Sequence, residues 1–499
     1  MILTGILSVL TFKTLAIILG GTVVGIFMGS IPGLTVTMGV ALFLPVTFGM
    51  EPIDGLSLLL GLYIGGTSGG FIAAILLNIP GAPSSIATTF DGYPLAKQGK
   101  AGKALGVGIL CSFFGGVFSL IVLYFLSPVL AEAALSFGAY EYFAIALFSL
   151  TLVAGLVGSS LTRGLIAAVL GLCITFIGMA PITAYPRFTF GFHEFDAGIS
   201  LLPALIGLFA VAQVFEDAEN RITEKESHAM SYKIRGFGLS MKEFIGQLRN
   251  LIRSSLLGTA IGVLPGIGGA VTNIIAYGVA KRRSGHPETY GKGDIGGVVA
   301  TESSNNASIG GAMVPLMTLG IPGDNTTAIL LAGFMIHGIA PGPMLFESNG
   351  VLVYGIFTAL LVSHIFMLIS MYFGMKGFVR VLSVPRHILM PIIMILCIVG
   401  AYGLNNRLFD VWTMLAFGVI GYVMKKVSLP STPLLLGFIL GPIIEVNLRR
   451  GLMQSRGDFL PFFTHPVSGT FIALTIVIVS IIAVKQVCNL RKKSKAIAS

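Results

Sequence analysis

Long apolar segments separated by short polar ones run along the whole chain. Four of the clearest lie at residues 104–130, 142–161, 351–373 and 468–484. About 20 consecutive apolar residues cross the hydrocarbon core of a bilayer as an α-helix, and a helix satisfies its own backbone hydrogen bonds in lipid. The pattern therefore predicts an all-α polytopic membrane protein with roughly 11–13 membrane segments.

A Pro-Gly pair interrupts the apolar pattern at four places. The pairs are Pro32-Gly33, Pro80-Gly81, Pro265-Gly266 and Pro322-Gly323. Proline removes a backbone donor and clashes with the preceding turn, whereas glycine adopts angles that other residues avoid, so each pair is expected to end or unwind a helix. Such re-entrant or discontinuous helices are tolerated at membrane depth where protein or a cavity surrounds them. They are typical of the binding sites of secondary transporters.

The breaks recur in matching order in the two halves of the chain. The Gly-x-x-Pro-Gly motif at 29–33 returns at 262–266, an offset of 233 residues, and the Ile-Pro-Gly motif at 79–81 returns at 321–323, an offset of 242. Two similar offsets indicate an internal duplication, inverted or parallel. The predicted organisation is a first transmembrane repeat at 1–215, a basic linker at 216–253, and a second repeat at 254–499 that includes the C-terminal spans and a basic tail.

Composition supports a membrane protein and argues against nucleic acid as a partner. Hydrophobic residues form 55% of the chain and charged residues 10%, with a mean hydropathy of +0.92, whereas soluble domains are roughly one-quarter charged. The net charge of +10 comes from short loops between apolar segments, which is the positive-inside pattern of cytoplasmic loops. The segments predicted to be cytoplasmic are 97–103, 216–253, 281–283, 425–426 and the tail around 491–495, with 185–196 on the opposite side.

The four cysteines indicate neither a disulfide framework nor a zinc site. Cys111, Cys173, Cys397 and Cys488 are far apart, and all but the last lie in apolar segments. They are interpreted as small hydrophobic residues.

Small hydroxyl or amide side chains follow each Pro-Gly break. They are Thr35 and Thr37, Ser84 and Ser85, Thr272 and Asn273, and Asn325, Thr326 and Thr327. A helix that restarts after a break presents free N–H groups and the positive end of its dipole, which suit a carboxylate. The alternative is ordinary N-capping, which the same residue types favour. Because the breaks occur in two matched pairs, the site interpretation is preferred. The Pro-Gly backbones are predicted to bind an anionic substrate together with Thr35, Ser84, Ser85, Asn325, Thr326 and Thr327.

A polar run at 302–308, Glu-Ser-Ser-Asn-Asn-Ala-Ser, lies between the two breaks of the second half. Amide oxygens are suitable ligands for a hard monovalent cation, and asparagine is costly to bury at membrane depth without a role. Asn305 and Asn306 are therefore predicted to lie near a cation, with a solvated loop end near residues 292–294 as the alternative. Asp324, directly after the last break, is predicted either to support the cation or to cap the restarting helix.

Two short motifs allow an enzymatic interpretation. Gly66-Thr67-Ser68-Gly69 has the form found around an intramembrane serine nucleophile, with His337 or His364 as a possible base. Residues 291–294, Gly-Lys-Gly-Asp, have the form found in intramembrane aspartyl proteases, but no Tyr-Asp partner segment accompanies them. Both matches are short and weak, and no Gly-x-x-x-x-Gly-Lys-Ser/Thr loop for nucleotide hydrolysis is present.

Several longer motifs resemble the large membrane subunit of tripartite tricarboxylate transporters, the TctA family. The matching segments are 65–70, 78–104, 264–269, 290–293, 302–307, 319–323 and 338–346. The resemblance covers most of the chain. It implies a bacterial inner-membrane permease that works with a small TctB-like membrane subunit and a periplasmic TctC-like binding protein. Asp324 departs from the family pattern, where a neutral serine is more frequent.

The predicted function is cation-coupled import of a di- or tricarboxylate, with Na⁺ or H⁺ as the coupling ion. No cofactor, catalytic residue or metal other than a possible Na⁺ is expected. An intramembrane serine protease centred on Ser68 and an anion channel are the alternatives.

Overall fold

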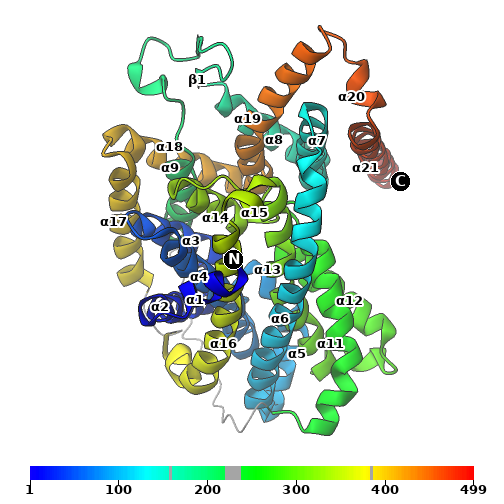
Figure 1. The fold of residues 1–499 in the computed structure, drawn as a ribbon. Coiled ribbons are helices and arrows are strands. Elements are labelled where there is room, and N and C mark those ends of the chain that lie inside the picture. The colour runs from blue at the N-terminus through cyan, green and yellow to red at the C-terminus, as the bar shows by residue number, and fades with distance from the viewer. Residues whose placement is uncertain (157–159, 220–237, 382–385, 499) are drawn as a thin grey trace. The chain divides into compact units, whose positions relative to one another are not determined.

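The computed structural model confirms an all-α membrane protein (Figure 1). It describes residues 1–156, 160–219, 238–381 and 386–498. Within these residues, seven helices are long and apolar enough to cross a membrane: Phe12–Ser30, Pro52–Leu77, Thr88–Leu135, Leu201–Glu219, Gly350–Arg380, Leu408–Lys426 and Ser431–Gln454. Six shorter apolar helices accompany them: Val36–Thr47, Ala139–Gly155, Leu161–Thr175, Asn325–Ile336, Leu389–Gly403 and Pro466–Ile481. The expected total of roughly 11–13 segments is reached only if shorter helices count as membrane segments.

Two compact units divide the chain, and each takes segments from both sequence halves. Unit 1 comprises residues 1–132 and 209–407, and unit 2 comprises 133–208 and 408–499. The helices of unit 1 are α1 (Ile2–Val9), α2 (Phe12–Ser30), α3 (Val36–Phe43), η1 (Leu44–Thr47), α4 (Pro52–Leu77), η2 (Pro83–Ser85), α5 (Thr88–Leu95), η3 (Ala96–Lys100), α6 (Ala101–Leu135, whose end belongs to unit 2), α10 (Ala212–Glu219), α11 (Met241–Gly262), α12 (Gly268–Arg283), η6 (Pro287–Thr289), α13 (Ile295–Leu319), α14 (Asn325–Ile336), α15 (Met344–Ser348), α16 (Gly350–Val381) and α17 (Arg386–Asn405).

Unit 2 is built around α19 (Ser431–Gln454), which packs against α7 (Ala139–Leu156) and α8 (Leu161–Thr175). A bidentate ion pair between Arg187 and Glu445, with N–O distances of 2.7 and 3.1 Å, joins the 185–196 segment to α19. The remaining elements are β1 (Gly178–Met179), β2 (Pro186–Arg187), η4 (His193–Phe195), α9 (Leu201–Leu205), α18 (Leu408–Lys426), α20 (Leu460–Thr464) and α21 (Pro466–Ala498). η5 (Ile206–Val211) lies at the boundary of the two units.

Helices end close to all four Pro-Gly pairs, as the sequence predicts. α2 ends at Ser30, α4 at Leu77, α11 at Gly262 and α13 at Leu319, and a new helix or helical turn begins a few residues later. The chain turns through left-handed backbone at Gly33 (φ 95°) and Gly266 (φ 72°), where a side chain would be strained. The other two pairs follow a left-handed residue, Asn78 (φ 60°) or Gly320 (φ 70°), which ends the helix.

The helices before the breaks pair within each half, α2 with α4 and α11 with α13 (Figure 1). Close approaches fall at glycines, among them Gly25 against Leu62 and Gly29 against Gly66 in the first pair, and Gly258 against Ser304 and Gly262 against Ser308 in the second. Small residues let membrane helices come this close. The four contacts correspond under the offsets of 233 and 242 found in the sequence. This correspondence supports an internal duplication.

The polar run at 302–308 lies in the middle of α13, and all of its side chains are buried. The solvated loop end considered as an alternative for this run is therefore wrong. The contacts of α13 explain the burial, since α11, α12, α4 and α5 all pack against it.

The predicted linker at 216–253 is helical at both of its described ends. α10 extends to Glu219, and α11 begins at Met241 with a capping box between Ser240 and Glu243. Residues 220–237 lie outside the described part of the chain. The basic tail at 491–495 continues the backbone of α21.

Candidate functional site

The helices that restart after the first and fourth breaks meet each other within unit 1. The Oγ1 atoms of Thr37 in α3 and Thr326 in α14 are 3.1 Å apart, a hydrogen bond between residues 289 positions apart in sequence. Thr35 caps α3, since its Oγ1 accepts from the N–H of Met38 at 3.1 Å. Thr326 and Thr327 are buried, whereas Thr35, Thr37 and Asn325 are partly exposed.

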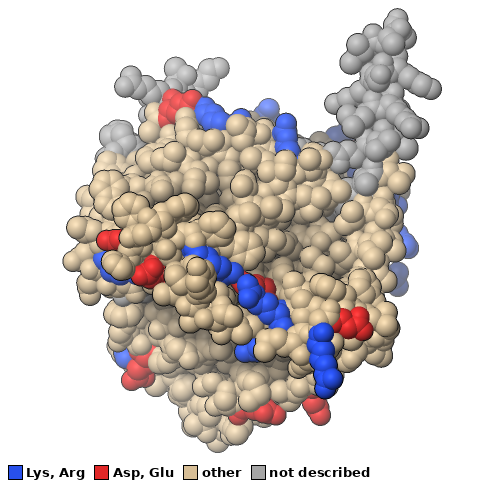
Figure 2. All heavy atoms as spheres, turned by 90° about the horizontal axis from the view of Figure 1, so that it is seen from above, with Lys and Arg blue, Asp and Glu red and all other residues tan. Residues whose placement is uncertain are grey.

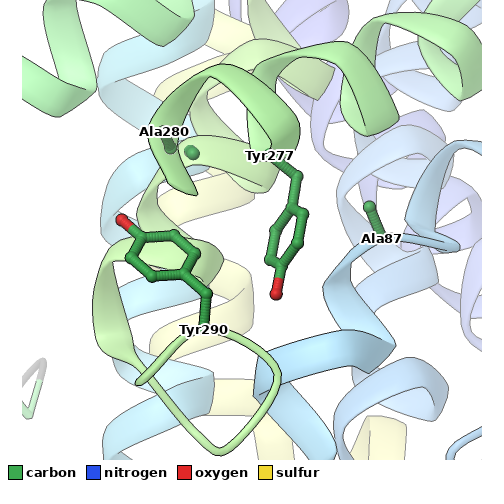
Figure 3. Close-up of a cluster of buried hydrophobic side chains, with 5 residues drawn as sticks. Ala87, Tyr277, Ala280 and Tyr290 are labelled. Carbon is green, nitrogen blue, oxygen red and sulfur yellow. The ribbon is translucent and has the colours of Figure 1, made fainter. Parts of the chain in front are cut away.

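The helices that restart after the second and third breaks also meet. The backbone N–H of Ala87 donates to Oδ1 of Asn273 in α12 at 2.8 Å, and Asn273 Nδ2 donates to the carbonyl of Thr301 at 3.1 Å. Figure 3 shows Ala87 beside Tyr277, in an apolar cluster that also contains Ala280, Tyr290 and Ala300. A segment of the first half is thus docked on a segment of the second.

Two further contacts join neighbouring breaks within each half. The backbone of Gly81 lies against the carbonyl oxygen of Gly29, where any Cβ would collide. The N–H of Gly266 donates to the carbonyl of Gly323 at 2.7 Å. Together with the Thr37–Thr326 and Ala87–Asn273 contacts, these links form a closed circuit, which we call the break ring. All four predicted breaks are therefore linked by direct contacts within unit 1.

Two buried polar side-chain atoms, one just after the second break and one on α13, lack a hydrogen-bond partner. Oδ1 of Asn305 and Oγ of Ser85 are buried and have no hydrogen-bond partner. Nδ2 of Asn305 donates to the carbonyl of Thr67 at 3.3 Å, so Oδ1 faces the other way. A Cβ placed at Gly269 would lie 2.7 Å from that oxygen and 3.0 Å from Cβ of Ser84. The sequence-predicted residues Ser84 and Asn305 thus lie together, next to the start of α12.

Asn306 has a different environment from Asn305. Its Oδ1 accepts a hydrogen bond from Ser68 at 2.7 Å, across the crossing of α4 and α13. Nδ2 of Asn306 donates to the carbonyl of Glu302 at 3.4 Å. The side chain of Asn306 therefore cross-links two helices, and Asn305 is the vicinal asparagine with a free oxygen.

Asp324 caps α14. One carboxylate oxygen accepts from the N–H of Thr327 at 2.7 Å, and Thr327 Oγ1 accepts from the N–H of Asp324 at 2.8 Å. The other oxygen accepts from the hydroxyl of Tyr63 in α4 at 2.5 Å. The capping role considered for Asp324 is observed, and both of its oxygens have protein partners.

The geometry gives no support to a serine nucleophile at Ser68, whose hydroxyl donates to an amide oxygen. Neither candidate base contacts it: Nδ1 of His364 lies 2.8 Å from the carbonyl of Leu360, and Nε2 of His337 is buried without a partner. A base must reach the proton that it abstracts, at about 2.6–3.2 Å. Ser68 is a packing and cross-linking residue in this structure.

The Gly-Lys-Gly-Asp motif at 291–294 is a structural turn. Asp294 caps α13, accepting from the N–H of Gly296 at 2.8 Å. Oδ1 of Asp91 in α5 accepts from the N–H groups of Gly291, Gly293 and Asp294 at 2.8, 2.9 and 2.9 Å. Asp91, which connects the first half of the chain to the turn before α13, could not be identified from this motif.

Two segments predicted to be cytoplasmic, 97–103 and 216–253, meet the turn at residues 288–294 at one end of unit 1. Lys103 pairs with Glu243 at 2.5 Å, and Gln98 donates to the carbonyl of Lys292 at 2.7 Å. Hydrogen bonds from Lys103 and from Ser240 lower the pKa of Glu243 to about 2. A cavity of about 500 Å³ lies there, lined by Lys100, Lys103 and Lys292 together with Glu288 and Asp294. Uncharged residues cover most of the face in Figure 2.

Substitution of Ser68 by alanine is expected to lower stability without abolishing transport. The change leaves Oδ1 of Asn306 buried without its donor, which costs about 1–3 kcal/mol. Thermal unfolding of the purified variant and its uptake in vesicles measure the two effects. Loss of a peptide-cleaving activity in this variant would instead support the protease.

Comparison with known proteins agrees with the resemblance found in the sequence. Residues 15–436 match the family model "Tripartite tricarboxylate transporter TctA family". A protein of Agrobacterium vitis described as an "Uncharacterized 52.8 kDa protein in TAR-I ttuC' 3'region" is 35% identical over 473 residues, which are 95% of this chain and 94% of that protein. An "Uncharacterized protein in TAR-II ttuC' 3'region" of the same organism is 37% identical over 222 residues, 44% of this chain and 92% of the relative. No solved structure matches significantly. The chain belongs to the tripartite tricarboxylate transporter TctA family.

Proposed function

We propose that this protein is the membrane permease of a secondary transporter that imports a di- or tricarboxylate. The observation that carries the proposal is the break ring, in which four restarting helices of two halves converge within one unit. Helix N-termini attract carboxylates through free N–H groups and the helix dipole. Membership of a transporter family supports transport as the activity in place of enzymatic catalysis.

The proposed substrate ligands come from all four breaks. They are Pro32, Gly33 and Thr35; Pro80, Gly81, Ser84 and Ser85; Pro265 and Gly266; and Pro322, Gly323, Asn325, Thr326 and Thr327. Within this set, Ser85 Oγ and Asn325 Oδ1 are the buried side-chain atoms without a protein partner. The hydroxyl of Ser85 can donate to a substrate carboxylate, whereas the amide oxygen of Asn325 can only accept, for example from a hydroxyl group of the substrate.

Import of a multivalent anion requires a coupling cation. Moving a dianion inward against 100 mV, inside negative, costs about 4.6 kcal/mol before any concentration gradient. At least two co-transported cations, Na⁺ or H⁺, cancel that charge. Asn305 and Asn306 are the proposed residues near the cation, and the free oxygen of Asn305 is the stronger candidate ligand. Asp324, whose two oxygens bond Thr327 and Tyr63, is proposed to cap α14 and not to bind the cation directly.

The proposed transport system has two further protein components and lies in the bacterial inner membrane. By family membership, a TctB-like small subunit and a TctC-like periplasmic binding protein accompany the permease in the bacterial inner membrane. The linker at 216–253 and the C-terminus are proposed to be cytoplasmic by the positive-inside rule. The meeting of Lys103, Glu243 and Lys292 at one end of unit 1 supports this orientation.

Uptake into proteoliposomes tests the proposal directly. A labelled carboxylate panel is offered to the reconstituted protein, with and without the binding protein, under Na⁺ and proton gradients. Accumulation should stop when both gradients are collapsed. Passive equilibration that ignores the gradients would indicate an anion channel, and accumulation that follows ATP alone would contradict secondary transport.

The Ser84→Ala, Ser85→Ala double variant is expected to lose substrate affinity roughly tenfold or more, because hydrogen bonds to a charged group contribute about 1.5–3 kcal/mol each. Ser348→Ala is the matched control, since this hydroxyl is exposed on α15 and donates to its own helix. The concentration dependence of uptake measures the change. Unchanged affinity in the double variant would remove these serines from the substrate site.

A further inference from the structure

Glu302 is a buried carboxylate at the centre of α13 that no cation balances. Its side chain has no exposed surface. No Lys, Arg or His of the described chain lies within ion-pair distance of it. An ionised carboxylate in such surroundings is unfavourable, and an ionisable residue at membrane depth marks an ion or proton pathway.

Two neutral hydroxyl groups are the hydrogen-bond partners of this carboxylate. Oγ1 of Thr88 donates to Oε1 at 2.5 Å, and Oγ of Ser112 in α6 donates to Oε2 at 3.3 Å. A hydroxyl both donates and accepts, so Thr88 can serve the ionised and the protonated form alike. The site therefore accommodates either state of Glu302 without rearrangement of its partners.

Three other buried carboxylates, Asp54, Asp91 and Glu445, have a cationic partner or several backbone N–H donors. Asp54 pairs with Lys13 at 2.6 Å and Glu445 with Arg187 at 2.7 Å. Asp91 accepts three backbone N–H groups through one oxygen. Those carboxylates have cations or N–H donors beside them, whereas the partners of Glu302 are two neutral hydroxyl groups.

Several ionisable groups lie on the elements packed around Glu302, but its hydrogen-bond partners are the hydroxyls of Thr88 and Ser112. The ionisable groups are Cys111 on α6, Asp91 on α5, Tyr277 on α12, Arg253 on α11, Tyr63 on α4 and Asp324 next to α14, with Asp294 at the start of α13 and His364 of α16 against Gly116. None is hydrogen-bonded to Glu302. Arg253 bonds Asn250, Tyr63 bonds Asp324, and His364 bonds Leu360.

The contacts of Glu302 connect it to the break ring. Thr88 is the first residue of α5, the helix that restarts after Ser84 and Ser85. Glu302 also precedes Asn305 and Asn306 by three and four positions, which places all three on one side of α13. A movement of α5 that accompanies substrate binding would alter the Thr88–Glu302 hydrogen bond.

We propose that Glu302 takes up and releases the proton that accompanies the substrate. The carboxylate binds one proton from the outer solution to become a neutral carboxylic acid, and it returns that proton to the inner solution after the substrate leaves. This inference rests on the proposed transport function and assigns H⁺ as at least one of its coupling ions.

The test compares wild type, Glu302→Gln and Glu347→Gln in proteoliposomes. Glutamine imitates the protonated carboxyl and cannot release a proton, so Glu302→Gln should retain substrate exchange at equal concentrations and lose accumulation driven by a proton gradient. Glu347 is exposed on α15, and its glutamine variant should behave as wild type. Thr88→Val, which keeps the carboxyl, should shift the pH dependence of uptake.

A second measurement does not depend on transport. Infrared spectra of the purified protein across a pH series should show a protonated-carboxyl band that Glu302→Gln removes and Glu347→Gln leaves. Proton-driven accumulation that survives in Glu302→Gln, or a band unaffected by the change, would overturn the assignment. Absence of carboxylate transport in wild type, with the band still removed, would instead refute the proposed function.

Discussion

Asp324→Ala is expected to lower the free energy of unfolding by about 2–4 kcal/mol. Loss of a helix N-cap costs about 0.5–2 kcal/mol, and the change removes the cap of α14. It also leaves the hydroxyl of Tyr63 without its acceptor, and a buried donor without a partner costs about 1–3 kcal/mol. Thermal unfolding in detergent measures the loss.

Asp324→Asn separates the cap from the charge. Asparagine is also a favoured N-cap residue, so this variant should lose less stability than the alanine variant. Because both oxygens of Asp324 have protein partners, the Na⁺ and pH dependence of uptake should be unchanged. Glu347→Gln is the control, since it removes the same kind of charge from an exposed position on α15 outside the proposed site. A weaker cation dependence in Asp324→Asn at wild-type stability would show that Asp324 is a cation ligand.

The positions of the helix breaks could be predicted from sequence because their cause is local. Proline lacks a donor and glycine lacks a Cβ, so the effect of each pair is confined to its own turn. The matching offsets of the motifs likewise reappear in the structure, as corresponding contacts at Gly29 and Gly262. These predictions require only the identity and the spacing of the proline and glycine residues in the sequence.

The pairing of the breaks could not be predicted, because it depends on contacts between distant segments. Nothing near Thr37 in sequence indicates Thr326, and nothing near Asn273 indicates the backbone of Ala87. Tyr63 lies in an unbroken apolar helix, with no sign that it would bond Asp324. The two compact units also interleave in sequence, which hydropathy does not reveal.

The polar run at 302–308 was ambiguous in the sequence for a physical reason. Polar residues occur both in solvated loops and in buried sites where protein groups satisfy them. The run is buried because neighbouring helices supply hydrogen-bond partners, which are Ser68 of α4, Thr88 of α5 and Ser112 of α6. The sequence motif contains Glu302, but only the structure shows that its side chain has no cationic side chain of the described chain beside it.

Gly29→Ala is expected to prevent stable folding of unit 1. A Cβ at this position would collide with the carbonyl oxygen and backbone of Gly66 in α4. Overpacking costs about 1–3 kcal/mol when side chains can move aside, and here the obstacle is a helix backbone, so the loss should be at or above about 3 kcal/mol. Yield of monodisperse protein and the thermal unfolding midpoint measure the effect.

Gly20→Ala is the matched control on the same helix, because a Cβ at Gly20 has no heavy atom within 4 Å. It should be neutral, or stabilising by up to about 1 kcal/mol from helix propensity.

The same comparison in the second half tests the duplication. Gly262 corresponds to Gly29, and a Cβ there would lie 2.6 Å from the carbonyl oxygen of Ser308, while Gly246 on the same helix has open space. Gly262→Ala should therefore be as damaging as Gly29→Ala, and Gly246→Ala as harmless as Gly20→Ala. A tolerated Gly262→Ala would mean that α11 and α13 can separate where α2 and α4 cannot. If the two helix crossings are equivalent copies that each fix the position of a break, the same glycine substitution should destabilise both. A tolerated Gly262→Ala would therefore show that the two pairs share a sequence pattern but not its structural role.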